Sequence, residues 1–273
     1  MHFAFCILHF EFFMIGVFDS GLGGLSVWQA LHDALPNESL LYLGDGARCP
    51  YGSRSSEEVR QFTEEAVERL LSEGCKLIVL ACNTATAVAV KYLREKYPNV
   101  PFVGLEPAVK PAALSTKSGV IGVLATERSL QGDHFRRNEE KYGSTVKILK
   151  AVGEGFVEAV ENNEEHTAQT AELVRKAVEP LVEGGADKIV LGCTHYPFLR
   201  EVIERVAGSG VEVIDSSEAV ARRVATLLDE HNLRADATTR AEYRFLTFAD
   251  EAYAEKLKAK AFCRIEKKKE TIK

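Results

Sequence analysis

The chain has 273 residues, of which 46% are hydrophobic and 27% are charged. This composition is typical of globular proteins and argues against a disordered or collagen-like chain. The length allows a sizeable core and lies near the size at which chains divide into two domains. With 34 basic and 40 acidic residues the net charge is −6, which argues against nucleic acid as the main partner. No apolar run reaches about 18 residues, so the sequence predicts no membrane span.

Residues 1–13 differ from the rest of the chain because they include five phenylalanines and no Lys or Arg. They lack the basic start and the small-residue cleavage site of a secretory signal. Met14 directly precedes a strand-like run, so we hypothesise that the natural start is Met14 and that residues 1–13 are a non-native or disordered leader. The alternative is a short extra strand. With no export signal, the six cysteines favour reduced thiols in a cytosol over a disulfide framework.

Strand and helix patterns alternate from Met14 onward. Short apolar runs predict strands at residues 15–18, 40–43 and 77–81. Helical patterns occupy residues 25–35 and the segment that starts at Ser55 or Ser56 and ends at Gly74. Fully apolar strands fit a parallel sheet covered on both faces, so the alternation predicts an α/β fold with mostly parallel sheets.

The same pattern then repeats. KLIVLACNT, at residues 76–84, returns as DKIVLGCTH at residues 187–195, and an offset of 111 residues separates Cys82 from Cys193. The preceding helix keeps this register, and IGVFDS at Ile15 returns as IGVLAT at Ile121. The sequence therefore predicts two homologous, pseudosymmetric α/β domains, each with one cysteine at the carboxyl end of an equivalent strand.

The domain boundaries follow from the linking segments. The proline-containing segment at residues 104–112 predicts a crossover into the second domain. A strand near residues 213–215, a capped helix and a late strand at residues 243–248 predict a return to the first. We expect residues 14–106 plus 214–262 to form the first domain and residues 107–213 the second, with a frayed, charged tail at residues 263–273.

The strongest candidates for chemistry are the two matched cysteines. Ligands of open α/β sheets bind beyond the carboxyl ends of the strands, so two facing domains place Cys82 and Cys193 at one cleft. Each cysteine is expected to begin a helix, whose positive end lowers the pKa of the thiol. Asn83 and Thr84 offer polar groups to a ligand. A lone cysteine is usually a buried, inert residue, but two at matched positions favour catalysis.

Two further segments lie at the same predicted edge. The glycine-rich loop at residues 19–24 follows a strand and lacks the pattern of a Walker or dinucleotide-binding loop, which leaves a carboxylate-binding loop or a tight turn. Its Asp19 is either a helix cap or a group poised over the cleft. Tyr51 and Gly52 lie on a loop that is either a turn or a substrate contact.

A metal site is the alternative for the same atoms, since Asp19, Cys82, Cys193 and His195 are possible ligands. Neither cysteine has the closely spaced partner of a structural zinc site, so the sequence predicts no metal. His195 is instead expected to position or deprotonate a neighbouring thiol. The remaining cysteines, including Cys49, are expected to be structural.

These motifs together resemble the glutamate racemases of the cofactor-independent aspartate/glutamate racemase superfamily, and they span nearly all of residues 14–262. The segments that carry the resemblance are GVFDSGLGGLSV, GDGARCPYGSRS, ACNTATA, GLEPAVKPA, GVLAT, LGCTHYPFL and IDSSEAVA. The resemblance implies two pseudosymmetric α/β domains with the active site between them. It also implies interconversion of L- and D-glutamate without a cofactor, which supplies bacterial peptidoglycan synthesis in the cytoplasm. A homodimer is possible, because the family varies in its assembly.

The resemblance also implies roles for single residues. Cys82 and Cys193 correspond to the two catalytic bases, and Asp19 and His195 to their supporting acid/base partners. A supporting glutamate in the second domain matches Glu161 first and Glu158 second. The implied substrate contacts are Asp19, Ser20, Tyr51, Gly52, Asn83, Thr84, Thr194 and His195.

Three other functions stay open on the sequence alone. Aspartate racemase chemistry differs by one methylene in the substrate. A non-catalytic amino-acid-binding protein would use the cysteines structurally. A hydrolase built on Cys193 and His195 would leave the repeated cysteine without a purpose.

Overall fold

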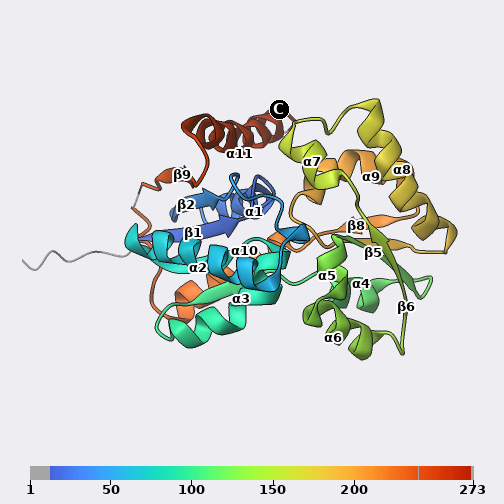
Figure 1. Ribbon diagram of the computed structural model, residues 1–273, viewed down its shortest axis with the longest axis horizontal. Helices are drawn as coiled ribbons and strands as arrows, with labels where there is room; N and C mark the ends of the chain where they lie inside the picture. Colours follow the sequence, from blue (N-terminus) through green and yellow to red (C-terminus); the bar gives the residue numbers. More distant parts are fainter. Residues whose placement is uncertain (1–12, 239, 272–273) are drawn as a thin grey trace, which may run out of the picture.

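Two parallel sheets organise the chain, one in each lobe of the computed structural model (Figure 1). The structure describes residues 13–238 and 240–271, so the predicted leader, apart from Phe13, lies outside the described residues. We call each sheet with its covering helices a lobe. Every strand pair in both sheets is parallel, as the apolar runs predicted.

The first lobe contains a five-stranded sheet in the order β4-β3-β1-β2-β9. Its strands are β1 (Met14–Asp19), β2 (Ser39–Gly44), β3 (Cys75–Leu80), β4 (Phe102–Gly104) and β9 (Tyr243–Thr247). Its helices are α1 (Leu25–Ala34), α2 (Ser56–Ser72), α3 (Asn83–Lys96), α10 (Ser217–Glu230) and α11 (Glu251–Thr271), with the 3-10 turn η1 (Tyr51–Ser53).

The second lobe contains a four-stranded sheet in the order β6-β5-β7-β8. Its strands are β5 (Val120–Ala125), β6 (Lys147–Val152), β7 (Lys188–Leu191) and β8 (Glu212–Ile214). Its helices are α4 (Val109–Ser115), α5 (Glu127–Gln131), α6 (Asp133–Tyr142), α7 (Phe156–Glu161), α8 (Ala168–Glu183) and α9 (Arg200–Ala207), with the 3-10 turn η2 (Tyr196–Leu199).

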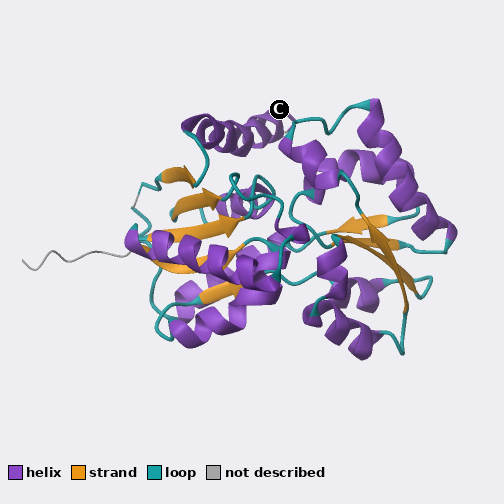
Figure 2. Ribbon diagram, viewed as in Figure 1, coloured by secondary structure: helices purple, strands orange, loops and turns teal. Residues whose placement is uncertain are grey.

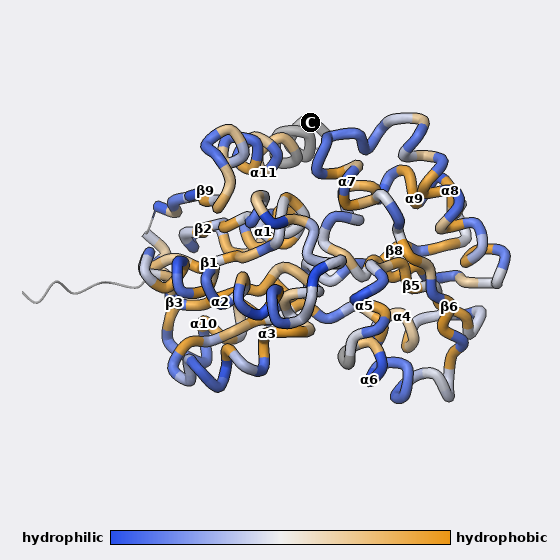
Figure 3. The backbone as a smooth tube through the Cα atoms, in the orientation of Figure 1, coloured by the Kyte–Doolittle hydropathy of each residue, from blue (hydrophilic) through white to orange (hydrophobic). Residues whose placement is uncertain are grey.

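Helices cover both faces of each sheet, as Figure 2 shows. Because side chains alternate along a strand, successive residues of β1 enter different cores. Ile15 and Val17 pack with α1, α10 and α11, whereas Met14 and Phe18 pack with α2 and α3. Hydrophobic residues are therefore concentrated on the inner strands, and the outer helix faces are polar (Figure 3).

The sheet orders display the internal repeat. β1 pairs with β2 and β3 in the first lobe, and β5 pairs with β6 and β7 in the second. The outer strands β4 and β8 then extend β3 and β7, and β9 is the one addition to the first sheet. The strands that precede Cys82 and Cys193 thus occupy equivalent places beside the central strand of each sheet.

The segment that was predicted to return to the first lobe differs from the prediction in two details. The strand expected near residues 213–215 pairs with β7, so it completes the second sheet. The following helix α10 packs with α1 in the core of the first lobe. The tail was expected to be frayed, but it continues helix α11, which runs from Glu251 to Thr271. This segment contains no Gly or Pro that would end the helix earlier.

Within residues 13–238 and 240–271, none of the helices combines the length and the apolar character needed to cross a bilayer.

Candidate active site

A cavity of about 360 Å³ lies where the carboxyl ends of strands from both lobes meet. Ser20 and Cys82 of the first lobe and Cys193 of the second share its wall. The other predicted site residues in the wall are Tyr51, Gly52, Asn83, Thr84, Thr194 and His195. A larger hollow of about 800 Å³ lies by α3, β4 and α10, and it contains none of the predicted site residues.

Cys82 caps the N-terminus of α3. Its Sγ accepts a hydrogen bond from the backbone N–H of Ala85 at 3.5 Å and lies 3.6 Å from Ser20 Oγ. Burial, reinforced by the negative charge of Asp19, nevertheless raises the pKa of the Cys82 thiol to about 12. The prediction of a lowered pKa is therefore wrong for Cys82, because the desolvation of a thiolate outweighs the helix N-terminus.

Cys193 follows β7 but does not begin an α-helix. The next element is the 3-10 turn η2, and α9 starts only at Arg200. The expected helix N-terminus is thus missing here, and the neighbouring polar group is a side chain. His195 Nδ1 lies 3.9 Å from Cys193 Sγ, so the imidazole is the group that contacts this thiol.

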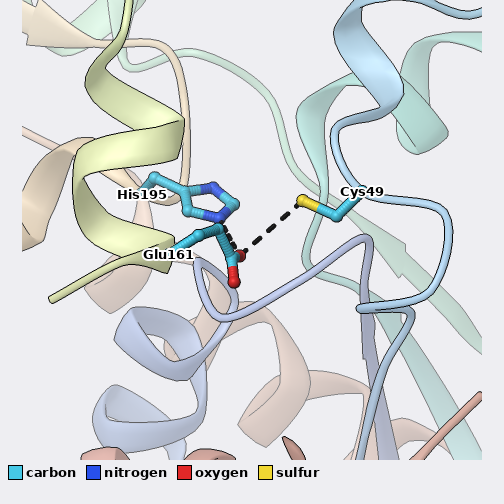
Figure 4. Close-up of side chains that lie close together, drawn as sticks. All are labelled: Cys49, Glu161 and His195. Atoms are coloured by element: carbon cyan, nitrogen blue, oxygen red, sulfur yellow. Dashed lines mark hydrogen bonds and ion pairs between the residues drawn. The ribbon is translucent and has the colours of Figure 1, made fainter. Parts of the chain in front are cut away.

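His195, which is buried, and Glu161, which is partly buried, form an ion pair (Figure 4). His195 Nε2 lies 2.7 Å from Glu161 Oε1. Burial favours the protonated carboxyl, but hydrogen bonds with His195 and other donors outweigh it and lower the pKa of Glu161 to about 2. Burial likewise opposes the imidazolium, but contacts with Cys193, Cys49 and Glu161 raise the pKa of His195 well above its ordinary value. A doubly protonated ring bonds Glu161 through Nε2 and can still donate from Nδ1 toward Cys193.

Asp19 lies at the end of β1 and is completely buried. Its carboxylate accepts hydrogen bonds from the backbone N–H of Gly21 at 2.8 Å and from Thr194 Oγ1 at 2.9 Å. Burial raises the pKa of Asp19, although the charge of His195 opposes the shift. Since Thr194 belongs to the second lobe and lines the cavity, Asp19 joins the two lobes, although Asp19 itself is not part of the cavity wall.

Among the predicted substrate contacts, Asn83 has a buried polar atom, Oδ1, without a hydrogen-bond partner in the described part of the chain. A buried acceptor of this kind fits a ligand that brings a donor, such as an ammonium group. Tyr51 differs, because its hydroxyl already donates to Asp45 Oδ2 at 2.5 Å.

The glycine-rich loop does bind a carboxylate, but the carboxylate belongs to the protein. The backbone N–H of Leu22 donates to Glu161 Oε1 at 2.7 Å. A Cβ on Gly21 would lie 2.1 Å from the same oxygen, and one on Gly23 would lie 2.3 Å from His195 Nδ1. The glycines therefore allow the loop to approach the His195–Glu161 pair, and of this loop only Ser20 lines the cavity.

Comparison with known proteins gives the family. The model of the Asp/Glu/Hydantoin racemase family matches residues 15–224. The chain belongs to this family. A glutamate racemase of Ectopseudomonas mendocina is 47% identical over 221 residues, which are 81% of this chain and 84% of that protein.

Solved structures of relatives confirm the fold class. A glutamate racemase from Bacillus anthracis has a TM-score of 0.82 at 36% identity and covers 90% of this chain and 92% of that one. Escherichia coli glutamate racemase in complex with L-glutamate and the activator UDP-MurNAc-ala has a TM-score of 0.80 at 31% identity and covers 89% and 92%. The predicted arrangement of two α/β lobes is thus the arrangement of the family.

The two candidate glutamates occupy different places. Glu158 is exposed and lines the cavity, whereas Glu161 lies behind His195 and contacts it. Two contacts of Glu161 were not foreseen: Cys49 Sγ lies 3.7 Å from Oε1, and the hydroxyl of Tyr253 donates to Oε2 at 2.8 Å. The only available signal for Cys49 was its place beside Pro50 and Tyr51. Nothing in the sequence pointed to Tyr253.

Cys49, Glu161 and His195 also form the group with metal-binding potential among the described residues (Figure 4). Their ligand atoms lie within 4.8 Å of one another. This group differs from the ligand set considered on the sequence, with which it shares only His195. Glu161 Oε1 already bonds to His195 and Leu22, and burial raises the pKa of the Cys49 thiol to about 11. The shared oxygen of this group, Glu161 Oε1, therefore already accepts hydrogen bonds from within the protein.

Proposed function

We propose that this chain interconverts L- and D-glutamate by direct proton transfer at Cα, with no metal or pyridoxal phosphate. The observation that carries the proposal is the pair of cysteines, which line one cavity from equivalent strand ends of two homologous lobes. Removal of an α-proton from one face and its replacement on the other require a base and an acid on opposite sides of the substrate. Cys82 and Cys193 are the groups to which we assign these roles.

The proposed step is balanced in protons. The thiolate of one cysteine takes the α-hydrogen as a proton, and the C–H electron pair stays on the substrate as a carbanion delocalised into its carboxylate. The thiol of the other cysteine then gives its proton to the opposite face and becomes the thiolate. The reverse reaction exchanges the two roles, so the same site serves both enantiomers.

The buried setting of Cys82 suits a difficult deprotonation. A thiolate whose conjugate acid has a high pKa is a stronger base, although it is less populated before substrate binds. The ammonium group of an incoming amino acid would stabilise this thiolate electrostatically. On the other side, we assign His195 the role of hydrogen-bonding Cys193, with Glu161 holding the imidazolium. Asp19 acts on the Cys82 side through its charge, and its contact with Thr194 connects it to the other lobe.

Glutamate is the proposed substrate because the relatives at 47% and 36% identity are named glutamate racemases and the E. coli structure contains L-glutamate. The proposed substrate contacts are Ser20, Gly52, Asn83, Thr84 and Thr194, with Tyr51 contributing its loop. The product D-glutamate would serve peptidoglycan synthesis in the bacterial cytoplasm.

We also propose the domain bounds given by the repeat, residues 14–106 with 214–262 and residues 107–213. Sheet membership agrees with these bounds except at Ile214, which pairs with β7 and so belongs to the second sheet. A homodimer stays a prediction, which light scattering on the purified protein would check.

Polarimetry of the purified protein tests the function. Loss of optical rotation is expected with L-glutamate and with D-glutamate, and much slower loss with L-aspartate. Activity should survive EDTA and hydroxylamine, because neither metal nor pyridoxal phosphate is required, and thiol alkylation should abolish it. If the protein racemised aspartate and not glutamate, aspartate would replace glutamate as the proposed substrate. Loss of activity in EDTA with recovery on adding zinc would contradict the two-thiol reaction.

A further inference from the structure

The C-terminal helix α11 contributes a tyrosine to the back of the candidate site. Tyr253 lies in its first turn, and its hydroxyl donates to Glu161 Oε2 at 2.8 Å. The other carboxylate oxygen, Oε1, bonds to His195 and to the backbone N–H of Leu22. Both oxygens of Glu161 thus have donors, and the Tyr253 hydroxyl bonds the oxygen that does not face His195.

We propose that Tyr253 is a positioning residue for the acid–base pair: it fixes the Glu161 carboxylate, which in turn holds the His195 imidazole against Cys193. This inference rests on the proposed function. It assigns no direct contact with substrate to Tyr253, which is absent from the cavity wall. The hydroxyl acts through a chain of contacts from Tyr253 to Glu161, His195 and Cys193.

The helix that carries Tyr253 is firmly anchored in the first lobe. Leu257 and Ala261 of α11 are completely buried in the core that also contains α1. The tyrosine is therefore presented from a rigid element, and side chains on rigid elements hold a site more closely than side chains on loops.

The same helix is tied to the element that carries Glu161. Lys256 Nζ donates to the backbone oxygen of Glu161, and Lys260 Nζ donates to Asn163 Oδ1 at 2.9 Å. Lys260 also forms an ion pair with Glu165. Cations at the C-terminal end of α7 interact favourably with the helix dipole. These contacts join α11 of the first lobe to α7 of the second, which Figure 1 shows beside the C-terminal part of α11.

A glycine makes room for the tyrosine ring. A Cβ on Gly46, in the loop after β2, would lie 2.4 Å from two carbons of the Tyr253 ring. Any side chain at residue 46 would therefore displace the ring. The loop after β2 and the C-terminal helix are matched to each other at this point, independently of the hydrogen bond.

The experiment compares Tyr253→Phe with a matched control, Tyr92→Phe. Tyr92 also donates to a glutamate, Glu64, at 2.8 Å, but on the outer helices of the first lobe. For Tyr253→Phe we expect kcat to fall roughly tenfold, a part of the effect of a positioned acid–base group, with KM within roughly twofold. Tyr92→Phe should keep the kcat of the unmodified protein.

Kinetic isotope effects distinguish a positioning role from a merely structural role, which would leave them unchanged. Because racemisation has an equilibrium constant of one, kcat/KM must stay equal in the two directions, whereas the α-deuterium isotope effects need not. If Tyr253→Phe slows only the proton transfer at Cys193, the isotope effect should rise for the enantiomer that Cys193 deprotonates and fall for the other. Gly46→Ala, which displaces the ring, should separate the two isotope effects in the same way.

Isotope effects that stay the same as in the unmodified protein in both variants, or an unchanged kcat, would overturn the positioning role. That result is distinct from failure of the proposed function, in which the unmodified protein would not racemise glutamate at all.

Discussion

The two cysteines have different neighbours although their strands are equivalent. Cys82 is surrounded by Ser20 and the N-terminus of α3, whereas Cys193 is contacted by the imidazole of His195. A symmetric fold therefore offers two chemically different half-sites. This fits a reaction whose two enantiomeric substrates are deprotonated from opposite sides.

Replacing either thiol tests this assignment. Cys82→Ser or Cys193→Ser should abolish racemisation in both directions, since every turnover needs one cysteine as base and the other as acid. Serine is nearly isosteric, and its hydroxyl is far less acidic than a thiol. Circular dichroism and a polarimetric assay on the same preparations would measure folding and activity together. A folded serine variant with near-normal rates would show that its cysteine is not a base.

The His195–Glu161 pair predicts a pH dependence of stability. The pKa of Glu161 falls from 4.5 to about 2, so its contribution is complete above pH 4.5 and is lost as the pH falls toward 2. The pKa of His195 is raised above 6.5, so its contribution is complete below pH 6.5 and is lost as the pH rises through the folded-state value. The pair therefore stabilises the fold most between about pH 4.5 and 6.5.

Glu161→Gln should remove this contribution. We expect the free energy of unfolding to fall by on the order of 2–3 kcal/mol near pH 5.5, and the deficit to shrink at more acidic and more alkaline pH. Urea denaturation at a series of pH values from about 2 to 9 would measure it. A deficit that stays constant with pH would mean that the two groups do not titrate as a pair.

At the scale of single residues, the sequence predicted those site residues that a repeat or a neighbouring residue marked. Cys82 and Cys193 were identifiable because a repeat marked them, and His195 because it lies two residues from Cys193. Tyr253 was not, because its partner Glu161 is 92 residues away and only the folded chain brings them together. The raised pKa of Cys82 was also missed, since helix position is visible in the sequence and complete burial is not.

Secondary elements followed their local patterns closely. Ser55 caps α2 with a complete capping box, and Gly74 ends that segment with a φ of 83°. The structure departs from the predicted elements where tertiary contacts determine the local conformation. β8 has only three residues and pairs with β7, and the segment after Cys193 forms a 3-10 turn around Pro197 instead of an α-helix.

The loop between β1 and α1 gives a prediction for an element. Gly23→Ala would place a Cβ 2.3 Å from His195 Nδ1 and 2.6 Å from Thr194 Oγ1. His195 is buried and bonded to Glu161, so its ring cannot move freely. We expect a loss of about 1–3 kcal/mol of stability from overpacking, and a fall in kcat of at least roughly tenfold as the imidazole shifts.

Gly210→Ala is the matched control, because a Cβ there meets no atom within 4 Å. Its stability should change by less than about 0.5 kcal/mol, and its activity should stay the same. Thermal unfolding and steady-state rates of both variants would test the pair. Normal turnover in Gly23→Ala would show that the loop does not set the position of His195.

At the scale of the whole molecule, the proposed reaction requires that the two lobes be held together with their cysteines at one cavity. The repeat predicted two similar sheets, and the paired strand orders confirm it. The repeat did not reveal which groups join the lobes. Asp19 bonds Thr194, Leu22 bonds Glu161 and Ser26 bonds the backbone oxygen of Thr194. Each contact links residues more than a hundred positions apart, beyond the reach of local patterns.

Isotope flow tests whether the two lobes act as two separate proton donors and acceptors. The reaction is run from L-glutamate in deuterated water and stopped early. If Cys82 and Cys193 act from opposite walls, the hydrogen delivered to the product comes from a thiol that exchanged with solvent before substrate bound. The thiol that captured the substrate proton faces the other side and cannot return it to form product. Early D-glutamate should therefore carry deuterium at Cα almost completely, while recovered L-glutamate stays largely protium.

A single base that reaches both faces would behave differently, because it can carry the captured proton across before that proton exchanges. Mass spectrometry of the separated enantiomers at low conversion distinguishes the two cases. Substantial protium in early D-glutamate would reject the two-cysteine mechanism even if both cysteines proved essential. Near-complete deuteration together with inactive serine variants would require two distinct groups, one contributed by each lobe.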